Sequence, residues 1–223
     1  FRRVLFRSEI QCRVLGCDLE SVNDNGIPIR NMPGELVIRQ PMPSMPVLFW
    51  GDEGHERYHS SYFEHFQGIW RHGDLVEITD RGTIIISGRS DATLNRDGVR
   101  IGTAELYQVI DTIPELADSL AVCIEDKDGG HWMPLFVLMR DREVLSDELR
   151  SRINAALRAR CSPRHVPDDI IAVSGIPYTL SGKKMEMPVK KVLMGAEPDA
   201  VASLDTMRDP EVLAGFTSFR RLT

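Results

Sequence analysis

Apolar and polar positions alternate over short stretches of residues 9–88, a pattern typical of half-buried β-strands. Pro41, Pro43 and Pro46 lack the amide hydrogen that a strand ladder needs, so the segment around them is expected to be an extended loop. A helix is expected at about 54–66. The alternation predicts strands over 10–15, 34–39, 75–79 and 83–87, the last two joined by the turn Asp80-Arg81-Gly82.

The period of the apolar positions changes to that of helices after about residue 102. Thr103 is expected to cap a helix whose inward face is formed by Leu106, Val109, Ile110 and Ile113. Ser146 is expected to cap a second helix, whose inward face is formed by Leu149, Ile153, Leu157 and Cys161. Strands are expected over 132–139 and 170–173, and a last helix over 188–194. The alternation of strands and helices predicts a small α+β domain, with a boundary in the glycine-bearing stretch 88–102.

Composition and charge narrow the function classes. The 223 residues carry 27 Lys and Arg against 33 Asp and Glu, a net charge of −6 that argues against a nucleic acid or an anionic membrane as the partner. No apolar run approaches the ~18 residues of a membrane span. The four cysteines form no C-x-x-C pair, so they are expected to be isolated reduced thiols, buried rather than bridged, in a cytoplasmic protein.

The first eight residues, Phe-Arg-Arg-Val-Leu-Phe-Arg-Ser, resemble the translation of a sequencing-library adapter. They lack the basic, apolar and small regions of a signal peptide, and arginines interrupt their apolar residues. The alternative is a genuine basic strand. If they are an artefact, the natural chain starts within a longer gene.

Three polar, glycine-bearing stretches are candidates for chemistry. Residues 70–74 contain Gly73-Asp74, which alone is more often a turn than a ligand site. Residues 88–106 place arginines at both ends of a loop before a helix, and guanidinium groups match phosphate oxygens. Residues 176–184 carry a lysine after Ser-Gly, which could bring a point charge into a site or could simply be solvated.

In this order and spacing, the three stretches resemble the adenylate-forming family of acyl-CoA synthetases, luciferases and peptide-synthetase adenylation domains. The resemblance covers residues 9–223. Stretches 42–46, 49–52, 162–167 and 210–216 are similar to the branch of that family that acts on acetoacetate. The resemblance implies an ATP-dependent acid–thiol ligase that joins acetoacetate to CoA through an acyl-adenylate.

The fold class that the resemblance implies is α+β. Residues 9–88 would be the β-rich C-terminal part of a large N-terminal domain, and residues 89–195 a small, mobile C-terminal domain. Residues 196–223 would be a tail, which Phe216 and Phe219 could anchor onto one of the domains.

The resemblance also implies roles in adenylation. Asp74 would accept hydrogen bonds from both ribose hydroxyls of ATP, since a carboxylate offers two oxygens. Arg89 would lie beside the ribose and phosphate, and Arg100 would contact phosphates. Lys183 would be the catalytic residue, bridging the substrate carboxylate and the α-phosphate as negative charge builds there.

CoA and domain movement would involve the segment between the two domains. Gly98 would lie against the pantetheine arm, where a side chain would obstruct the tunnel. Arg158 is the candidate for the 3′-phosphate of CoA, and Asp91 for the hinge. Asp97 departs from this picture because it places a carboxylate beside the loop expected to meet anionic CoA.

Other parts of such an enzyme are expected upstream. The chain contains no Gly/Ser/Thr-rich phosphate loop ending in lysine, and the adenine and acyl pockets would also belong to the missing N-terminal part. Mg²⁺ would accompany ATP, with no ligand assigned in this chain. The chain alone is therefore expected to be inactive.

Two alternatives remain open. His55-Glu56-Arg57-Tyr58-His59 matches the H-E-x-x-H pattern of zinc proteases, with His65 as a possible third ligand and Glu56 as base. A tyrosine at 62 stands where the third-ligand version requires glycine. The other alternative is a non-catalytic module that binds nucleotide or CoA through the small domain.

Overall fold

The computed structural model describes residues 9–90, 94–96, 99–125, 130–141 and 143–220, without the side chains of residues 95, 99, 100 and 204. The adapter-like residues 1–8 lie outside these ranges. The chain divides into two compact units, one ending at Asp91 and the other beginning at Ala92.

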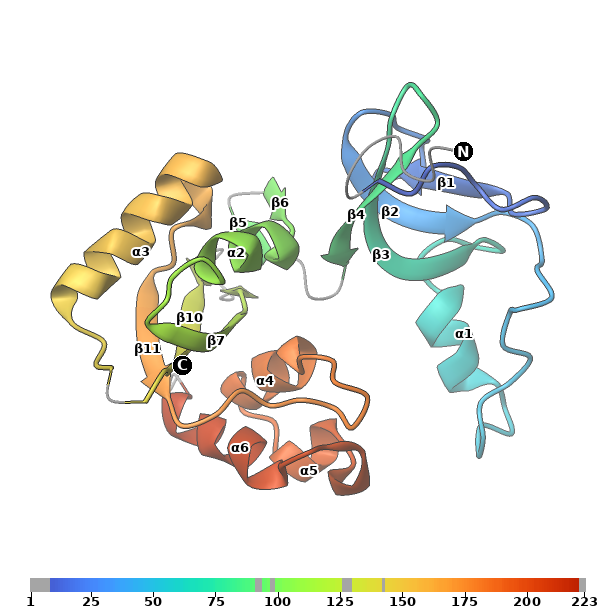
Figure 1. Cartoon of the computed structure of the whole chain (residues 1–223). Helices are drawn as coiled ribbons and strands as arrows, with labels where there is room; N and C mark the ends of the chain where they lie inside the picture. Colours follow the sequence, from blue (N-terminus) through green and yellow to red (C-terminus); the bar gives the residue numbers. More distant parts are fainter. Residues whose placement is uncertain (1–8, 91–93, 97–98, 126–129, 142, 221–223) are drawn as a thin grey trace. The chain divides into compact units, whose positions relative to one another are not determined.

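The first unit is built on a four-stranded antiparallel sheet in which sequential strands are neighbours (Figure 1). Its strands are β1 (Leu19–Val22), β2 (Pro33–Ile38), β3 (Trp70–Ile78) and β4 (Ile84–Arg89), and its one described helix is α1 (Glu56–Tyr62). Six of its buried apolar side chains form two small clusters: Val22, Val37 and Phe66 in one, and Val76, Ile78 and Ile84 in the other.

Two predictions for this unit are wrong. Residues 10–15 form no strand: Ile10 makes an isolated bridge to Ile84, and Leu15 is 99% exposed, so no core supports pairing there. The helix expected over 54–66 is shorter. It begins at Glu56 and ends at Tyr62. The carboxylate of Asp52 accepts the amide hydrogens of Arg57 at 3.1 Å and Tyr58 at 2.8 Å in the first turn.

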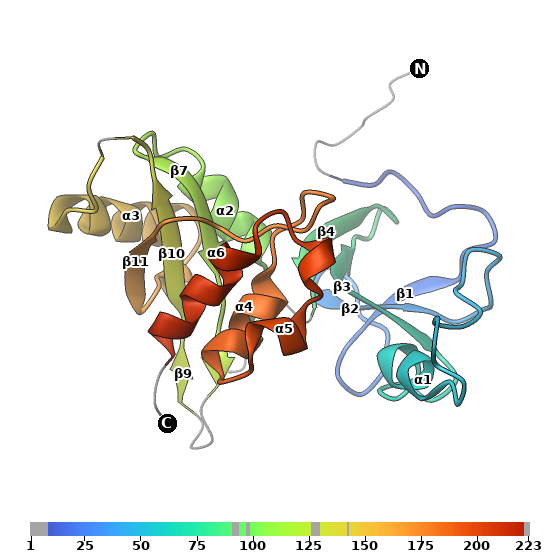
Figure 2. The ribbon, with the colours of Figure 1, turned by 90° about the horizontal axis from the view of Figure 1, so that it is seen from below.

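The second unit has a three-stranded sheet with the strand order β11-β10-β7, and helices cover it (Figure 2). Strands β10 and β11 are parallel, joined by helix α3, whereas β7 pairs antiparallel with β10.

The strands of the whole second unit are β5 (Leu94–Arg96), β6 (Val99–Ile101), β7 (Leu116–Ala121), β8 (Ile124–Glu125), β9 (His131–Trp132), β10 (Pro134–Met139) and β11 (Asp169–Val173). The α-helices are α2 (Thr103–Ile110), α3 (Asp147–Arg160), α4 (Glu186–Leu193), α5 (Pro198–Val201) and α6 (Pro210–Gly215), with 3-10 turns at Pro163–His165, Leu204–Thr206 and Phe216–Phe219.

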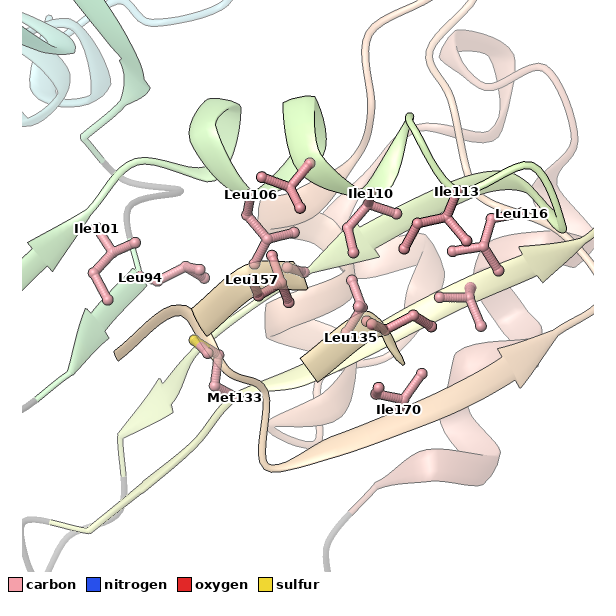
Figure 3. Packing of buried hydrophobic residues seen from close by; sticks show 14 of the residues in the cluster. Leu94, Ile101, Leu106, Ile110, Ile113, Leu116, Met133, Leu135, Leu157 and Ile170 are labelled. Carbon is pink, nitrogen blue, oxygen red and sulfur yellow. The ribbon is translucent and has the colours of Figure 1, made fainter. Parts of the chain in front are cut away.

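The central strand β10 is apolar on both faces because each face is covered. Leu135 packs in a cluster with side chains of α2 and α3, including Leu106 and Leu157 (Figure 3). Its neighbour Phe136 points to the opposite face and belongs to a second cluster, formed with α4, α6 and the last 3-10 turn. The second unit therefore has a buried core on each side of its sheet.

Ser146 caps α3 as predicted, since its hydroxyl accepts the amide hydrogen of Leu149 at 3.2 Å. Thr103 does not cap α2: it is the first helical residue, and the position before it is Gly102. The strand predicted over 132–139 is interrupted at Met133, whose amide donates to the Asp168 carboxylate instead of a neighbouring strand.

The segment predicted to be a tail is part of the second unit's core. Phe216 is 2% exposed, and its ring packs against that of Phe136 with centroids 4.8 Å apart. Phe219 also packs against Phe136, at 5.5 Å. These two residues do anchor the segment, as expected, and α5 and α6 make it structured.

Candidate functional site

Asp74 and Arg89 form a pair at the end of the β3–β4 ladder. They occupy directly opposite positions, and Oδ1 of Asp74 lies 3.7 Å from Nη1 of Arg89. The other carboxylate oxygen lies 2.5 Å from Nδ1 of His72. The Asp74 side chain is 19% exposed and that of Arg89 is 53% exposed. This end of the sheet therefore presents a held carboxylate beside a guanidinium that solvent reaches.

Gly73 allows the arginine to lie against the strand. Its φ of +85° is in the left-handed region, and a Cβ built on it would stand 2.7 Å from Nη2 of Arg89. Its carbonyl accepts the amide hydrogen of Ser90 at 3.0 Å. The Gly-Asp pair is thus part of strand β3 and is not an ordinary turn.

A buried carboxylate lies close to this pair, and sequence reasoning missed it. Glu35 on β2 is 3% exposed, and its oxygens contact Nη2 of Arg71 at 3.2 Å and the hydroxyl of Ser90 at 3.0 Å. The available signal was an acidic residue inside the apolar strand sequence Pro33–Ile38.

Lys183 lies in a loop of the second unit, directly after the turn at residues 180–182, and the backbone of this loop is hydrogen-bonded to itself. Thr179 N donates to the Lys183 carbonyl at 2.9 Å, and Lys183 N donates to the Thr179 hydroxyl at 3.1 Å. Gly182 has a φ of +82°, which turns the chain. Lys183 is exposed, and its ammonium contacts no partner among the described residues. The loop therefore holds the lysine backbone and leaves the side chain able to move.

The other predicted residues are described to different extents. Arg158 is exposed in the last turn of α3. Arg100 lies in β6 opposite Asn95, with its side chain outside the described part. Asp91, Asp97 and Gly98 lie outside the described residues.

Arg96, in the same hairpin as Arg100, has a structural role that the sequence did not indicate. Its guanidinium donates to the Val166 carbonyl and, at 2.7 Å, to the Asp168 carboxylate. The other oxygen of that carboxylate accepts the amide hydrogen of Met133. Arg96 therefore joins the β5–β6 hairpin to the segment before β11.

The zinc-protease interpretation is not supported. His55 precedes α1 in a left-handed conformation with φ +56°, so it does not share a helix face with His59. The imidazole of His65 packs against Phe66, with ring centroids 4.5 Å apart. No group of three or more His, Cys, Asp or Glu side chains suited to a metal ion occurs among the described residues.

The remaining sequence expectations concern thiols and membranes. All four cysteines are free, but only Cys123 is buried, so the expectation that they are generally buried is wrong. Within the described ranges, no helix has both the length and the apolar character needed to cross a membrane.

Comparisons with known proteins identify the class. No family model matches the chain. Acetoacetyl-CoA synthetase from Streptomyces lividans has a solved structure that is 44% identical, with a TM-score of 0.89 over 96% of this chain and 32% of that one. The chain belongs to the adenylate-forming family of acyl-CoA synthetases.

Two curated relatives carry the same enzyme name as that structure. Acetoacetyl-CoA synthetase from Gallus gallus is 41% identical over 94% of this chain and 31% of its own length. Acetoacetyl-coenzyme A synthetase from Rhizobium meliloti (strain 1021) is 41% identical over 98% of this chain and 33% of its own length. The chain thus spans about a third of the length of the curated relatives that it matches.

Proposed function

We propose that the chain is the C-terminal part of an AMP-forming acetoacetate–CoA ligase. In the first half-reaction, acetoacetate would attack the α-phosphate of ATP to give acetoacetyl-adenylate and pyrophosphate. In the second, the thiol of CoA would take the acyl group and AMP would leave. The likeness to the Streptomyces lividans enzyme across 96% of the chain carries this proposal.

The Asp74–Arg89 pair is suited to hold the nucleotide. A carboxylate fixed by His72 and Arg89 has lone pairs available for two ribose hydroxyls, and the exposed guanidinium can meet phosphate oxygens. Arg100 would also contact the phosphates. The described geometry supports this role for Asp74 and Arg89, while that of Arg100 rests on the family resemblance.

Lys183 would stabilise the transition state of adenylation. As the carboxylate oxygen attacks phosphorus and pyrophosphate departs, negative charge increases on the α-phosphoryl oxygens. An exposed ammonium on a hydrogen-bonded loop can approach those oxygens without first leaving another charge, because it has no ion-pair partner among the described residues. No proton transfer is required of it.

The second half-reaction would use other residues of the same unit. Arg158 offers an exposed guanidinium for the 3′-phosphate of CoA, and Gly98 would leave room for the pantetheine arm. Asp91 is proposed as the hinge, and the division of the chain between Asp91 and Ala92 supports that location.

Mg²⁺ would enter bound to ATP. No group of three or more acidic, histidine or cysteine side chains suited to a metal ion occurs among the described residues, and we assign Mg²⁺ no ligand in this chain. The upstream part would supply the phosphate loop and the adenine and acyl pockets. The four free thiols support a location in the cytoplasm.

The test uses an intact enzyme, made by joining this chain to the part of the Streptomyces lividans relative that this chain does not match. We expect acetoacetate-dependent exchange of pyrophosphate into ATP by the intact enzyme and none by the 223-residue chain. Lys183→Ala should lower the rate of exchange, because it removes several kcal/mol of transition-state stabilisation. It should spare thioester formation from supplied acetoacetyl-adenylate.

Lys191→Ala is the matched control, because Lys191 is an exposed lysine of α4. Absence of exchange in the intact enzyme would overturn the proposed ligase. Equal loss of both half-reactions in Lys183→Ala would overturn the role of Lys183 only.

A further inference from the structure

Lys184, the neighbour of Lys183, is fixed by three different groups. Its Nζ donates to the Ser119 carbonyl at 2.6 Å, lies 2.8 Å from Oδ1 of Asp118 and stands 4.1 Å from the centre of the Tyr107 ring. The side chain is 20% exposed. A carboxylate, a carbonyl and an aromatic face together satisfy the ammonium, so little freedom remains to it.

Asp118 holds both ends of the loop that carries Lys183. Its Oδ1 pairs with Lys184, and its Oδ2 accepts the hydroxyl hydrogen of Tyr178 at 2.7 Å. Tyr178 and Lys184 face each other in an antiparallel bridge at the base of the loop. Burial and the Asp118 carboxylate raise the pKa of Tyr178, so its phenol keeps the donated proton into the alkaline range. One carboxylate on β7 thus closes the base of the loop from both sides.

The aromatic face under Lys184 is itself fixed. The Tyr107 hydroxyl donates to Oε1 of Glu186 at 2.5 Å and accepts the amide hydrogen of Ala121 at 3.1 Å. These bonds join α2, β7 and the start of α4. The loop base therefore rests on three elements of the second unit's core.

We propose that Lys184 is a positioning residue for adenylation: its ion pair with Asp118 sets the loop so that Lys183 is presented outward. Adjacent residues of an extended segment point to opposite sides, so anchoring Lys184 inward directs Lys183 away from the core. An apolar side chain at 184 would leave the Asp118 carboxylate half-buried and without its cation, which is costly. This inference rests on the proposed function of Lys183.

The first test needs no catalysis. In the 223-residue chain, Lys184→Met keeps the apolar stem and removes the charge. Hydrogen exchange at the amides of Thr179, Gly182 and Lys183 should become about tenfold faster or more, while the amides of β10 stay protected. Lys191→Met on the surface of α4 is the control and should change neither. Unchanged loop exchange in Lys184→Met would overturn the proposal.

The second test uses the intact enzyme and separates the half-reactions. Lys184→Met should lower kcat of pyrophosphate exchange on the order of 100-fold, because misplacing a catalytic group by about 1 Å has that cost. The KM for ATP and thioester formation from supplied acetoacetyl-adenylate should change little. Adding Asp118→Asn to Lys184→Met should cost little more, since the pair is already broken.

The outcomes are distinguishable. If the parent intact enzyme forms no acetoacetyl-adenylate, the proposed function is wrong, whatever the exchange data show. If it does and Lys184→Met retains its rate, or loses both half-reactions equally, the positioning role is wrong.

Discussion

The carboxylate of Glu35, on β2, accepts a hydrogen bond of 3.0 Å from the hydroxyl of Ser90, the residue before the division between the two compact units. The second oxygen of the carboxylate lies 3.2 Å from Nη2 of Arg71, and that nitrogen also donates to the Ser90 hydroxyl at 3.3 Å. A buried carboxylate therefore ties the last described residue of the first unit to two inner strands. The residue directly before the proposed hinge at Asp91 is therefore held in place.

Glu35→Gln should destabilise the first unit. It removes the counter-ion of Arg71 at a site where Glu35 is 3% exposed. We expect a loss of about 2 kcal/mol, less than the usual cost of breaking a buried pair because the arginine side chain remains 32% exposed. Urea unfolding followed by Trp70 fluorescence, with Trp50 and Trp132 replaced by Phe in both variants and the parent, measures it. Glu53→Gln, an exposed acid of the same unit, is the control, and equal stability of the two variants would contradict the argument.

Asp91→Pro tests the hinge in the intact enzyme. Proline fixes φ near −65° and removes the amide hydrogen, which limits rotation at that position. We expect acetoacetyl-adenylate to form at a normal rate and thioester formation to fail. Asp91→Ala keeps the backbone free and should retain both half-reactions. A proline variant with an unchanged overall rate would place the rotation elsewhere.

The sequence predicted the local features best. Ser146 and the face formed by Leu149, Ile153 and Leu157 depend only on capping and helical spacing, so α3 was found almost to the residue. Strand β7 was missed because Asp118 and Ser119 interrupt its apolar pattern.

The partners of these two residues lie far away along the chain. Asp118 binds Tyr178, 60 positions on, and the Ser119 carbonyl binds Lys184, 65 positions on. The core position of Phe216 depends equally on a distant contact, with Phe136. The candidate site residues came from resemblance to a family, whereas Glu35 and Lys184 required the folded chain, because their partners come from other elements.

The second unit should lose stability at alkaline pH through Tyr178. Burial and the Asp118 carboxylate raise the pKa of its phenol above the ordinary value of about 10. Between these two pKa values the folded state keeps a proton that the unfolded state has lost. The stabilisation is therefore complete below about pH 10 and declines as pH rises above that.

Tyr178→Phe removes that titration. Compared with the parent chain, the variant should be less stable at pH 8, having lost the hydrogen bond to Asp118, and its stability should fall less steeply between about pH 10 and 11. The fluorescence of Trp132, which is 5% exposed, reports unfolding of the second unit once Trp50 and Trp70 are replaced by Phe. Parallel pH profiles for variant and parent would contradict the assignment.

The two units should also differ in their resistance to proteolysis. The buried clusters of the first unit are small, and its surface exposes Trp50 by 94% and Val47 by 85%. In the described sheet β2 is an inner strand, and β1 and β4 form its edges. Ile86 on β4 is 49% exposed, so that edge carries apolar surface beside the isolated bridge between Ile10 and Ile84.

The second unit buries both faces of its sheet, and Phe216 near the end of the chain completes one of them. Limited trypsin digestion of the 223-residue chain should therefore remove the first unit and leave a folded product from about residue 92 to about residue 220. Its C-terminal limit depends on the Phe136–Phe216 contact: Phe216→Ala should create a cavity costing about 3 kcal/mol and let digestion proceed past α6. Phe49→Ala, in the first unit, should leave the product unchanged. Mass spectrometry of the product decides this, and equal survival of the two units would mean that the first is stable without further chain around it.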